Sequence, residues 1–164
     1  MNQYLECNTV AFTGHREYKR SHDYAIMECV EQLVASGARE FRVGMAEGFD
    51  LAAALVVLEL RNRQPDIRLV AYIPYPNFRA RLSKECHTLY DTILEQTDQI
   101  HYIAQEYRHG IYYERNKALV DGADLVVAWW NGSRSGTGQT VRYARKQHIA
   151  IRNLFESQQL ELLL

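Results

Sequence analysis

Short apolar runs alternate along the chain with longer stretches in which apolar residues recur at helical spacing. The runs that predict strands cover residues 9–14, 40–45, 67–75, 99–104, 124–130 and 150–155. The spacing between them predicts helices at residues 23–37, about 50–63, within 77–97, at 110–123 and at 136–148. Strands joined by crossover helices pair in parallel. The pattern therefore predicts an α/β fold with a mostly parallel, Rossmann-like sheet and helices on both faces.

No internal repeat or linker-like segment divides the chain. A single Rossmann-like domain is therefore expected over residues 1–164, with its core at about 9–155. The tail at 156–164 is weakly determined and is compatible with a short helix, a dimer contact or a frayed end.

The composition narrows the classes of function. The 19 Lys and Arg residues against 20 Asp and Glu give a formal net charge of -1, which speaks against a general nucleic-acid binder. The three cysteines are widely spaced and the six histidines are scattered, so neither a disulfide framework nor a metal site is expected. The N-terminal segment lacks the apolar stretch of a signal peptide, and no apolar run reaches membrane-spanning length. We therefore expect a cytoplasmic protein without a membrane segment.

Open α/β sheets bind ligands beyond the carboxyl ends of their strands, and this rule directs attention to the loops there. The first strand ends in Thr13, Gly14, His15 and Arg16. The glycine allows close backbone approach, and the arginine can form two parallel hydrogen bonds to a phosphate or a carboxylate. An exposed basic turn is the alternative.

The second strand runs into a glycine turn that carries two acids. Gly44 and Gly48 give the turn freedom, and Ala46 keeps it narrow. Asp50 is expected to cap the following helix. Glu47 is expected to contact a ribose diol or an attacking water, as the acid of a dinucleotide fold contacts its ribose. Because two acids repel a bare phosphate, this turn is assigned to the sugar side of a ligand.

The next two loops supply cations and an amide. Arg79 follows the third strand in a segment where aromatic and basic residues interleave, which suits a nucleobase but equally a solvated surface loop. Arg115 and Asn116 are adjacent in the helix after the fourth strand, so they point in different directions and one of them is expected to face the site.

The loop after the fifth strand is rich in glycine and hydroxyl groups and opens onto a helix. Its candidate ligand residues are Asn131, Gly136, Thr137 and Gly138. Backbone N–H groups at a helix start form a ready anion site. The GK[ST] of a P-loop is absent, so hydrolysis of ATP through a Walker motif is not indicated. A flexible loop without a ligand is the alternative.

Together, "TGHR", "GMAEGFD", "YYERNKALVDGADLVVAWW" and "SGTGQTVRYARK" resemble the YpsA-like family of the SLOG superfamily, which is named for Smf/DprA and LOG proteins. The resemblance covers roughly Val10 to Phe155. It implies a Rossmann-like domain that binds a nucleotide or nucleotide-derived ligand, a homodimer, and a link to bacterial stress responses and cell division. The positions that match the family motifs are Gly14, His15, Arg16, Gly44, Glu47, Gly48, Asp50, Arg115, Asn116, Asp124, Gly136, Thr137 and Gly138.

One departure from the wider superfamily bears on activity. LOG enzymes carry a PGGxGTxxE-type signature whose glutamate is needed to cleave an N-glycosidic bond, whereas the matching run here, "SGTGQTVRYA", lacks that acid. LOG-like phosphoribohydrolase activity is thereby put in doubt. If the protein is an enzyme, Glu47 is the expected catalytic carboxylate.

Three functions are compared. The leading hypothesis is a sensor or regulatory module for a phosphorylated nucleoside, either ADP-ribose- or NAD-like or a nucleoside monophosphate, with no required cofactor. The second is a hydrolase of an N-glycosidic or phosphate bond in such a ligand. The third is DprA-like single-stranded DNA binding, which the near-neutral charge disfavours.

Overall fold

The computed structural model describes residues 6–155, and these form one six-stranded parallel sheet. The strands are β1 (Thr9–Gly14), β2 (Glu40–Val43), β3 (Arg68–Ile73), β4 (Gln99–Tyr102), β5 (Leu125–Trp129) and β6 (Ala150–Asn153). Their order in the sheet is β4-β3-β2-β1-β5-β6, and every neighbouring pair is parallel. The chain thus builds outward from β1 to β4 and then crosses back to place β5 on the other side of β1. This reversal is the switch point at which such sheets bind ligands.

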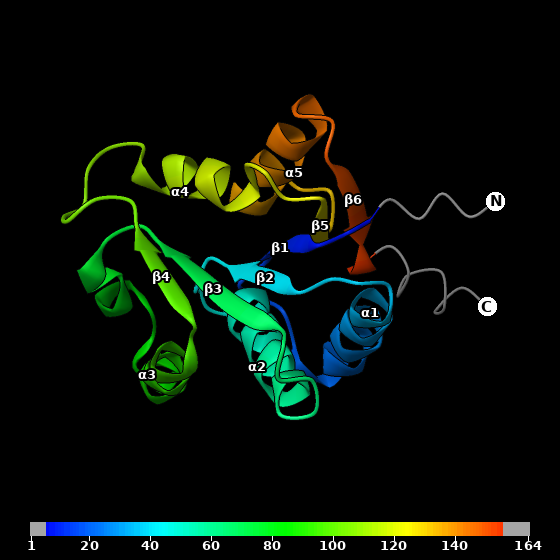
Figure 1. Ribbon diagram of the computed structural model, residues 1–164. Coiled ribbons are helices and arrows are strands. Elements are labelled where there is room, and N and C mark those ends of the chain that lie inside the picture. The colour runs from blue at the N-terminus through cyan, green and yellow to red at the C-terminus, as the bar shows by residue number, and fades with distance from the viewer. Residues whose placement is uncertain (1–5, 156–164) are drawn as a thin grey trace.

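Helices cover both faces of the sheet (Figure 1). The helices α1 (Asp23–Ala35), α2 (Phe49–Arg61) and α3 (His87–Gln96) lie on one face, and α4 (Ile111–Val120) and α5 (Gly136–Lys146) lie on the other. Three short 3-10 helices, η1 (Arg20–His22), η2 (Pro76–Arg81) and η3 (Lys84–Cys86), occupy the connections before α1 and α3. The predicted Rossmann-like α/β fold is confirmed. No helix within residues 6–155 is long and apolar enough to cross a membrane.

The strands are apolar on both faces because both faces are covered. In β1, Val10 and Phe12 pack into the core shared with α1 and α2, while Ala11 packs against Leu119 and Ala144 of the opposite layer. Helix α2 is buried over most of its length, which fits a helix that runs beneath the centre of a sheet. The core therefore fixes the carboxyl ends of β1, β2 and β5 as a rigid edge.

The predicted elements agree with the observed ones to within a few residues at their ends. The largest difference lies in the stretch 77–97, where two 3-10 helices precede a shorter α-helix. Helix α2 begins at Phe49, with Gly48 at its N-cap position. Asp50 therefore lies inside the helix, and the prediction that it caps α2 is wrong. The predicted tail at 156–164 lies outside the described residues.

Candidate functional site

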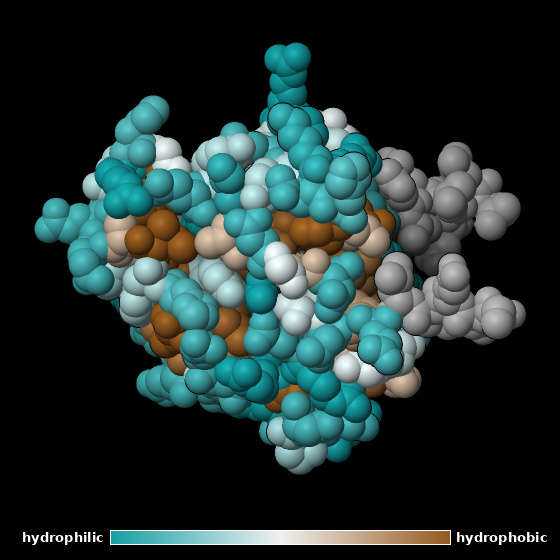
Figure 2. Space-filling view, turned by 45° about the horizontal axis from the view of Figure 1, so that its top comes forward, coloured by the Kyte–Doolittle hydropathy of each residue, from teal (hydrophilic) through white to brown (hydrophobic). Residues whose placement is uncertain are grey.

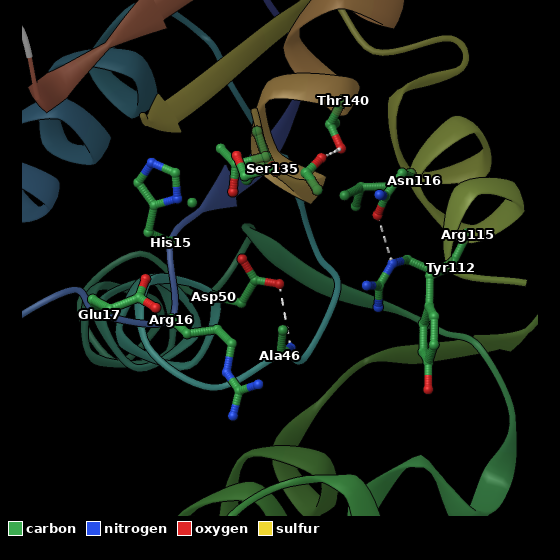
Figure 3. A pocket seen from close by; sticks show the side chains of 15 residues that line it. His15, Arg16, Glu17, Ala46, Asp50, Tyr112, Arg115, Asn116, Ser135 and Thr140 are labelled. Carbon is green, nitrogen blue, oxygen red and sulfur yellow. Dashed lines mark hydrogen bonds between the residues drawn. The ribbon is translucent and has the colours of Figure 1, made fainter. Parts of the chain in front are cut away.

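A pocket of about 290 Å³ opens at the carboxyl edge of the sheet, and we call it the main pocket (Figure 3). Its walls come from the β1–α1 loop, the β2–α2 turn, helix α4 and the start of α5. It is lined by Thr13, Gly14, His15, Arg16, Glu17, Ala46, Asp50, Tyr112, Arg115, Asn116, Leu119, Ser135, Gly136, Thr137 and Thr140. Segments far apart in the sequence therefore meet at the predicted switch point.

The β1–α1 loop and the β2–α2 turn are in direct backbone contact. The Phe49 N–H donates to the His15 carbonyl at 3.2 Å. Gly48 has a φ of 86°, and a Cβ there would lie 2.4 Å from the Arg16 carbonyl oxygen. Only glycine suits this position, because both its φ and its surroundings exclude a side chain. The contact fixes the two loops relative to each other.

Asp50 is the buried carboxylate of the main pocket. Its side chain accepts a hydrogen bond from the Ala46 N–H at 3.2 Å, so it closes the β2–α2 turn instead of capping the helix. Burial raises the pKa of Asp50 to about 6, and the Arg115 charge and the Ala46 hydrogen bond oppose that shift. A carboxyl group with such a pKa exchanges its proton close to neutral pH.

Arg115 brings a buried positive charge to the opposite wall. Its Nη1 donates to the Gly44 carbonyl at 2.6 Å, and its Nε donates to the Asn116 side-chain oxygen at 2.9 Å. A Cβ on Gly44 would lie 3.0 Å from the Asp50 carboxylate and 3.1 Å from Arg115 Nη1, so the bare glycine lets both groups approach. Burial lowers the pKa of Arg115, and the Asp50 charge counteracts this.

The Arg115 guanidinium keeps one donor group for a ligand. Within residues 6–155 its Nη2 makes no hydrogen bond, while its other nitrogens are held by Gly44 and Asn116. Figure 3 shows this guanidinium beside the Tyr112 ring and directed toward the pocket. One residue of the Arg115–Asn116 pair was expected to face the site, whereas both line the pocket, and Asn116 also orients the arginine.

The start of α5 has the features of an anion site. Ser135 is the N-cap residue, and its hydroxyl accepts from the Gly138 N–H at 3.1 Å. The first turn contains no acidic residue. The N–H groups of Gly136 and Thr137 have no partner inside the helix, because the first N–H groups of any helix lack one. Together with the helix dipole, these groups favour a negatively charged ligand at this wall of the main pocket.

His15 ties the first loop to the loop before α5. Its Nε2 accepts the Asn131 N–H at 3.0 Å, so the proton of the neutral ring is on Nδ1. The Asn131 side chain in turn accepts the Ser133 N–H at 3.0 Å. Asn131 thus orders the loop without lining the pocket.

Glu47 belongs to a second pocket of about 400 Å³, which we call the side pocket. It adjoins the main pocket through the shared residues Arg16, Ala46, Tyr112 and Arg115, and it is further lined by Glu47, Phe78, Arg81 and Leu82. Glu47 Oε1 accepts the Ser83 N–H at 2.7 Å and lies 3.3 Å from Arg16 Nη2. The structure therefore places Glu47 as a link between the β2–α2 turn and the segment before α3.

Most of the predicted site residues gather at the main pocket. Those that line it are Thr13, Gly14, His15, Arg16, Ala46, Asp50, Arg115, Asn116, Gly136 and Thr137. Those that line neither pocket are Gly44, Gly48, Arg79, Asn131 and Gly138. Arg79 makes a two-point ion pair with Asp91 of α3 at 2.7 and 2.8 Å. Asp124 accepts from the N–H groups of Asn8 and Thr9 at the start of β1, away from the pockets.

Sequence reasoning left out several lining residues. Tyr112 is one of them, and it lies three residues before Arg115 on α4 and so shares its face of the helix. Thr140 is another, four residues after Gly136 on α5, where its hydroxyl donates to the Gly136 carbonyl at 3.0 Å. Within residues 6–155, no three His, Cys, Asp or Glu side chains lie together in a way that could hold a metal ion.

Fold and site together define the class: a Rossmann-like α/β protein with a polar pocket at the carboxyl edge of its sheet. The family model named YpsA and described as "YspA SLOG family" matches residues 8–162. The chain belongs to this family, which confirms the resemblance inferred from the motifs.

Relatives are distant in sequence but extend over most of the chain. An uncharacterized SPbeta prophage-derived protein, YoqJ, of Bacillus subtilis is 24% identical over 137 residues, which cover 76% of this chain and 80% of that protein. A UPF0398 protein of Bacillus anthracis is 22% identical over 157 residues, which cover 88% of this chain and 85% of that protein.

Two solved structures share the fold. DNA processing protein A of Streptococcus pneumoniae aligns with a TM-score of 0.64 and 20% identity over 90% of this chain and 50% of that one. The same protein from Helicobacter pylori, whose structure concerns its binding of single-stranded DNA, aligns with a TM-score of 0.62 and 18% identity. That alignment covers 89% of this chain and 64% of the Helicobacter chain. This chain therefore spans about half to two thirds of these proteins.

Proposed function

We propose that the protein binds a nucleotide or nucleotide-derived ligand in the main pocket and acts as a sensor or regulatory module. The observation that carries this proposal is the start of α5, where unpaired N–H groups and a first turn free of acids face the buried guanidinium of Arg115. This arrangement suits a phosphate group. Asp50, on the wall formed by the β2–α2 turn, suits the hydroxyl groups of a sugar.

A second candidate function is favoured by the environment of Asp50. A carboxylate in a pocket with a pKa of about 6 is suited to general acid–base chemistry near neutral pH. In hydrolysis of an N-glycosidic bond, the water oxygen would bond to the anomeric carbon while Asp50 accepts the water proton. The bond between that carbon and the base nitrogen would break, and the departing base would take up a proton from solvent. Asp50 thus takes the role first assigned to Glu47, whose oxygens already accept from Ser83.

The hydrolase candidate has a direct test. Free base released from nucleoside monophosphates is measured for the wild type, for Asp50→Asn and for Glu47→Gln. Hydrolysis through Asp50 predicts that Asp50→Asn abolishes release while nucleotide binding persists, and that Glu47→Gln retains release. Release that never exceeds the blank contradicts the candidate.

Other expectations come with the family. A homodimer and a role in bacterial stress responses and cell division rest on the resemblance alone, and a cytoplasmic location rests on the sequence. Binding of single-stranded DNA is described for the Helicobacter neighbour, and the net charge of -1 disfavours it here.

Calorimetric titration tests the main proposal. The probes are inorganic phosphate, ribose 5-phosphate, AMP, GMP, ADP-ribose, NAD and a single-stranded oligonucleotide. We expect at least one nucleotide to bind in the micromolar range. Arg16→Ala is expected to weaken this binding on the order of tenfold, since a charged hydrogen-bond donor is lost. Arg142→Ala, which removes an exposed arginine of α5 that lines neither pocket, is the matched control.

Two results of these titrations would contradict the proposed function. Absence of binding to every small probe at millimolar concentration contradicts the proposal. Tight binding to the oligonucleotide alone, with a steep salt dependence, contradicts it in favour of a nucleic-acid binder.

A further inference from the structure

The side pocket has an apolar floor beneath a cationic mouth. Phe78 and Leu82, both almost fully buried, supply the floor together with the half-buried ring of Tyr112. Three arginines, Arg16, Arg81 and Arg115, reach this pocket, against the single acid Glu47. Flat apolar surfaces and guanidinium groups are the partners on which unpaired nucleobases stack.

Of the three arginines, Arg81 is the one that neither pairs with an acid nor donates to a backbone carbonyl within residues 6–155. Arg16 pairs with Glu47, and Arg115 is held by Gly44 and Asn116. Arg81 takes part in no ion pair within residues 6–155, and its guanidinium lies over the Tyr107 ring at 5.4 Å. A side-chain hydrogen bond to the Tyr75 hydroxyl raises the pKa of Arg81, so the guanidinium stays charged. A guanidinium has five N–H groups, so this bond leaves others for a ligand at the mouth of the side pocket.

The acceptors of the side pocket are already engaged. Both oxygens of Glu47 accept from Ser83, at 2.7 Å from its N–H and at 3.4 Å from its hydroxyl, and Oε1 also lies 3.3 Å from Arg16. The Tyr112 hydroxyl shares a hydrogen bond with Tyr75 at 3.2 Å. A ligand group that enters this pocket therefore meets free donors and few free acceptors.

Nucleobases differ in the edge that they offer to such donors. Guanine presents two neighbouring acceptors, O6 and N7, which one arginine binds with two parallel hydrogen bonds. Hypoxanthine has the same pair. Adenine presents the N7 acceptor beside an amino donor, so an arginine there loses one bond and faces another donor.

We propose that the side pocket binds the base of the nucleotide and that Arg81 selects a 6-oxopurine, guanine or hypoxanthine, over adenine. This inference rests on the proposed function, because the phosphate must occupy the main pocket for the base to reach the side pocket. Ala46 and Tyr112, which line both pockets, mark where the ligand passes from one to the other.

The test compares ligands and variants by calorimetry. GMP, IMP, AMP and ribose 5-phosphate are titrated into the wild type, Arg81→Ala, Arg81→Lys and Lys84→Ala. In the wild type, GMP and IMP are expected to bind on the order of tenfold more tightly than AMP. A single arginine that makes two hydrogen bonds to O6 and N7 is enough to give this difference in affinity. Arg81→Ala should bring this ratio close to one. Arg81→Lys should do the same, since lysine keeps the charge but lacks the fork.

The controls separate this inference from the proposed function. Ribose 5-phosphate, which has no base, should bind equally to the wild type and to Arg81→Ala. Lys84→Ala removes an exposed cation of the same segment that lines neither pocket and should leave the GMP-to-AMP ratio unchanged. Equal binding of GMP and AMP, or a ratio that survives Arg81→Ala or Arg81→Lys, overturns the base assignment and leaves the proposed function intact. Absence of binding to all four ligands overturns the base assignment, and it overturns the proposed function as well if ADP-ribose and NAD also fail to bind.

Discussion

Asp50 and Glu47 are separated by three positions in the sequence, yet they face different pockets. Met45 has a φ of 64° and Gly48 a φ of 86°, so the chain reverses twice within this short turn. These reversals bring Asp50 into the main pocket and leave Glu47 beside Ser83. From the sequence, Glu47 was expected at the ligand and Asp50 at the helix cap. The observed placement was not foreseen, because a buried methionine with positive φ leaves no local signal.

The buried Asp50 carboxyl makes stability depend on pH. Burial raises its pKa from 3.8 to about 6, so between these values the folded chain keeps a proton that the unfolded chain has released. The free energy of unfolding of the wild type should therefore fall, relative to that of Asp50→Asn, by roughly 3 kcal/mol between about pH 4 and pH 7. Urea unfolding of both proteins at several pH values measures this. A difference that stays constant with pH contradicts the assignment.

Gly48 offers a second prediction at the residue scale. Gly48→Ala introduces a Cβ that would lie 2.4 Å from the Arg16 carbonyl oxygen, at a φ that alanine avoids. We expect a destabilisation of about 3 kcal/mol or more in urea unfolding. Gly110→Ala is a milder comparison. Its φ of 82° is similar, but its ψ of 0° lies in the left-handed region, whereas the ψ of Gly48 is -122°, and nothing lies within 4 Å of the added carbon. It should cost only about 1 kcal/mol, and equal losses in the two variants would show that the loop contact is unimportant.

At the scale of elements, hydrophobic periodicity predicted all six strands and the five helices, since both faces of the sheet are covered and each helix buries one face. The ends of the elements were less predictable. The stretch before α3 forms 3-10 turns, although Phe78 and Leu82, which are buried beneath the side pocket, lie four residues apart, the spacing of an α-helix. In such segments, packing in the tertiary structure decides which secondary structure forms.

Helix α5 is the element to which the proposed function assigns the phosphate of the ligand. Ser135 caps it by accepting the Gly138 N–H, so Ser135→Ala should destabilise the protein by about 1 kcal/mol in urea unfolding. Ser135→Asn retains a side-chain acceptor at the cap and should keep most of the stability. If both variants are equally stable, the cap does not hold the start of the helix.

At the scale of the whole molecule, the site is made by contacts between distant parts of the chain. The Arg115–Gly44 hydrogen bond joins residues 71 apart, and the Asn131–His15 hydrogen bond joins residues 116 apart. Local pattern does not encode such pairings. The rule that ligands bind at the carboxyl ends of strands, together with the family motifs, still identified most of the lining residues. Neither the rule nor the motifs predicted the ion pair of Arg79 with Asp91, because that pairing depends on how α3 packs.

The distribution of hydrophobic and charged residues on the surface bears on which ligands the molecule can bind. On the face shown in Figure 2, hydrophobic residues gather in separate patches within a largely hydrophilic surface. The site itself combines both signs of charge, with Asp50 and Glu17 beside Arg16 and Arg115. Such a mixed lining suits a small ligand with a phosphate and hydroxyl groups better than a long polyanion.

The central claim is that the start of α5 holds the phosphate of a nucleotide, and one pair of variants tests it most directly. Gly136 is the first residue of α5, and a Cβ there meets nothing within 4 Å, so both Gly136→Asp and Gly136→Asn fit. An acid in the first turn stabilises a helix, so a loss of binding in Gly136→Asp would not reflect unfolding.

The measurement is calorimetric titration of GMP, with AMP as a second probe, into the wild type and both variants. Gly136→Asn should bind within a few-fold of the wild type, while Gly136→Asp should lose on the order of tenfold or more, because its carboxylate occupies the anion position. Equal affinities of the Asp and Asn variants, or no binding of either nucleotide to the wild type, would contradict the account.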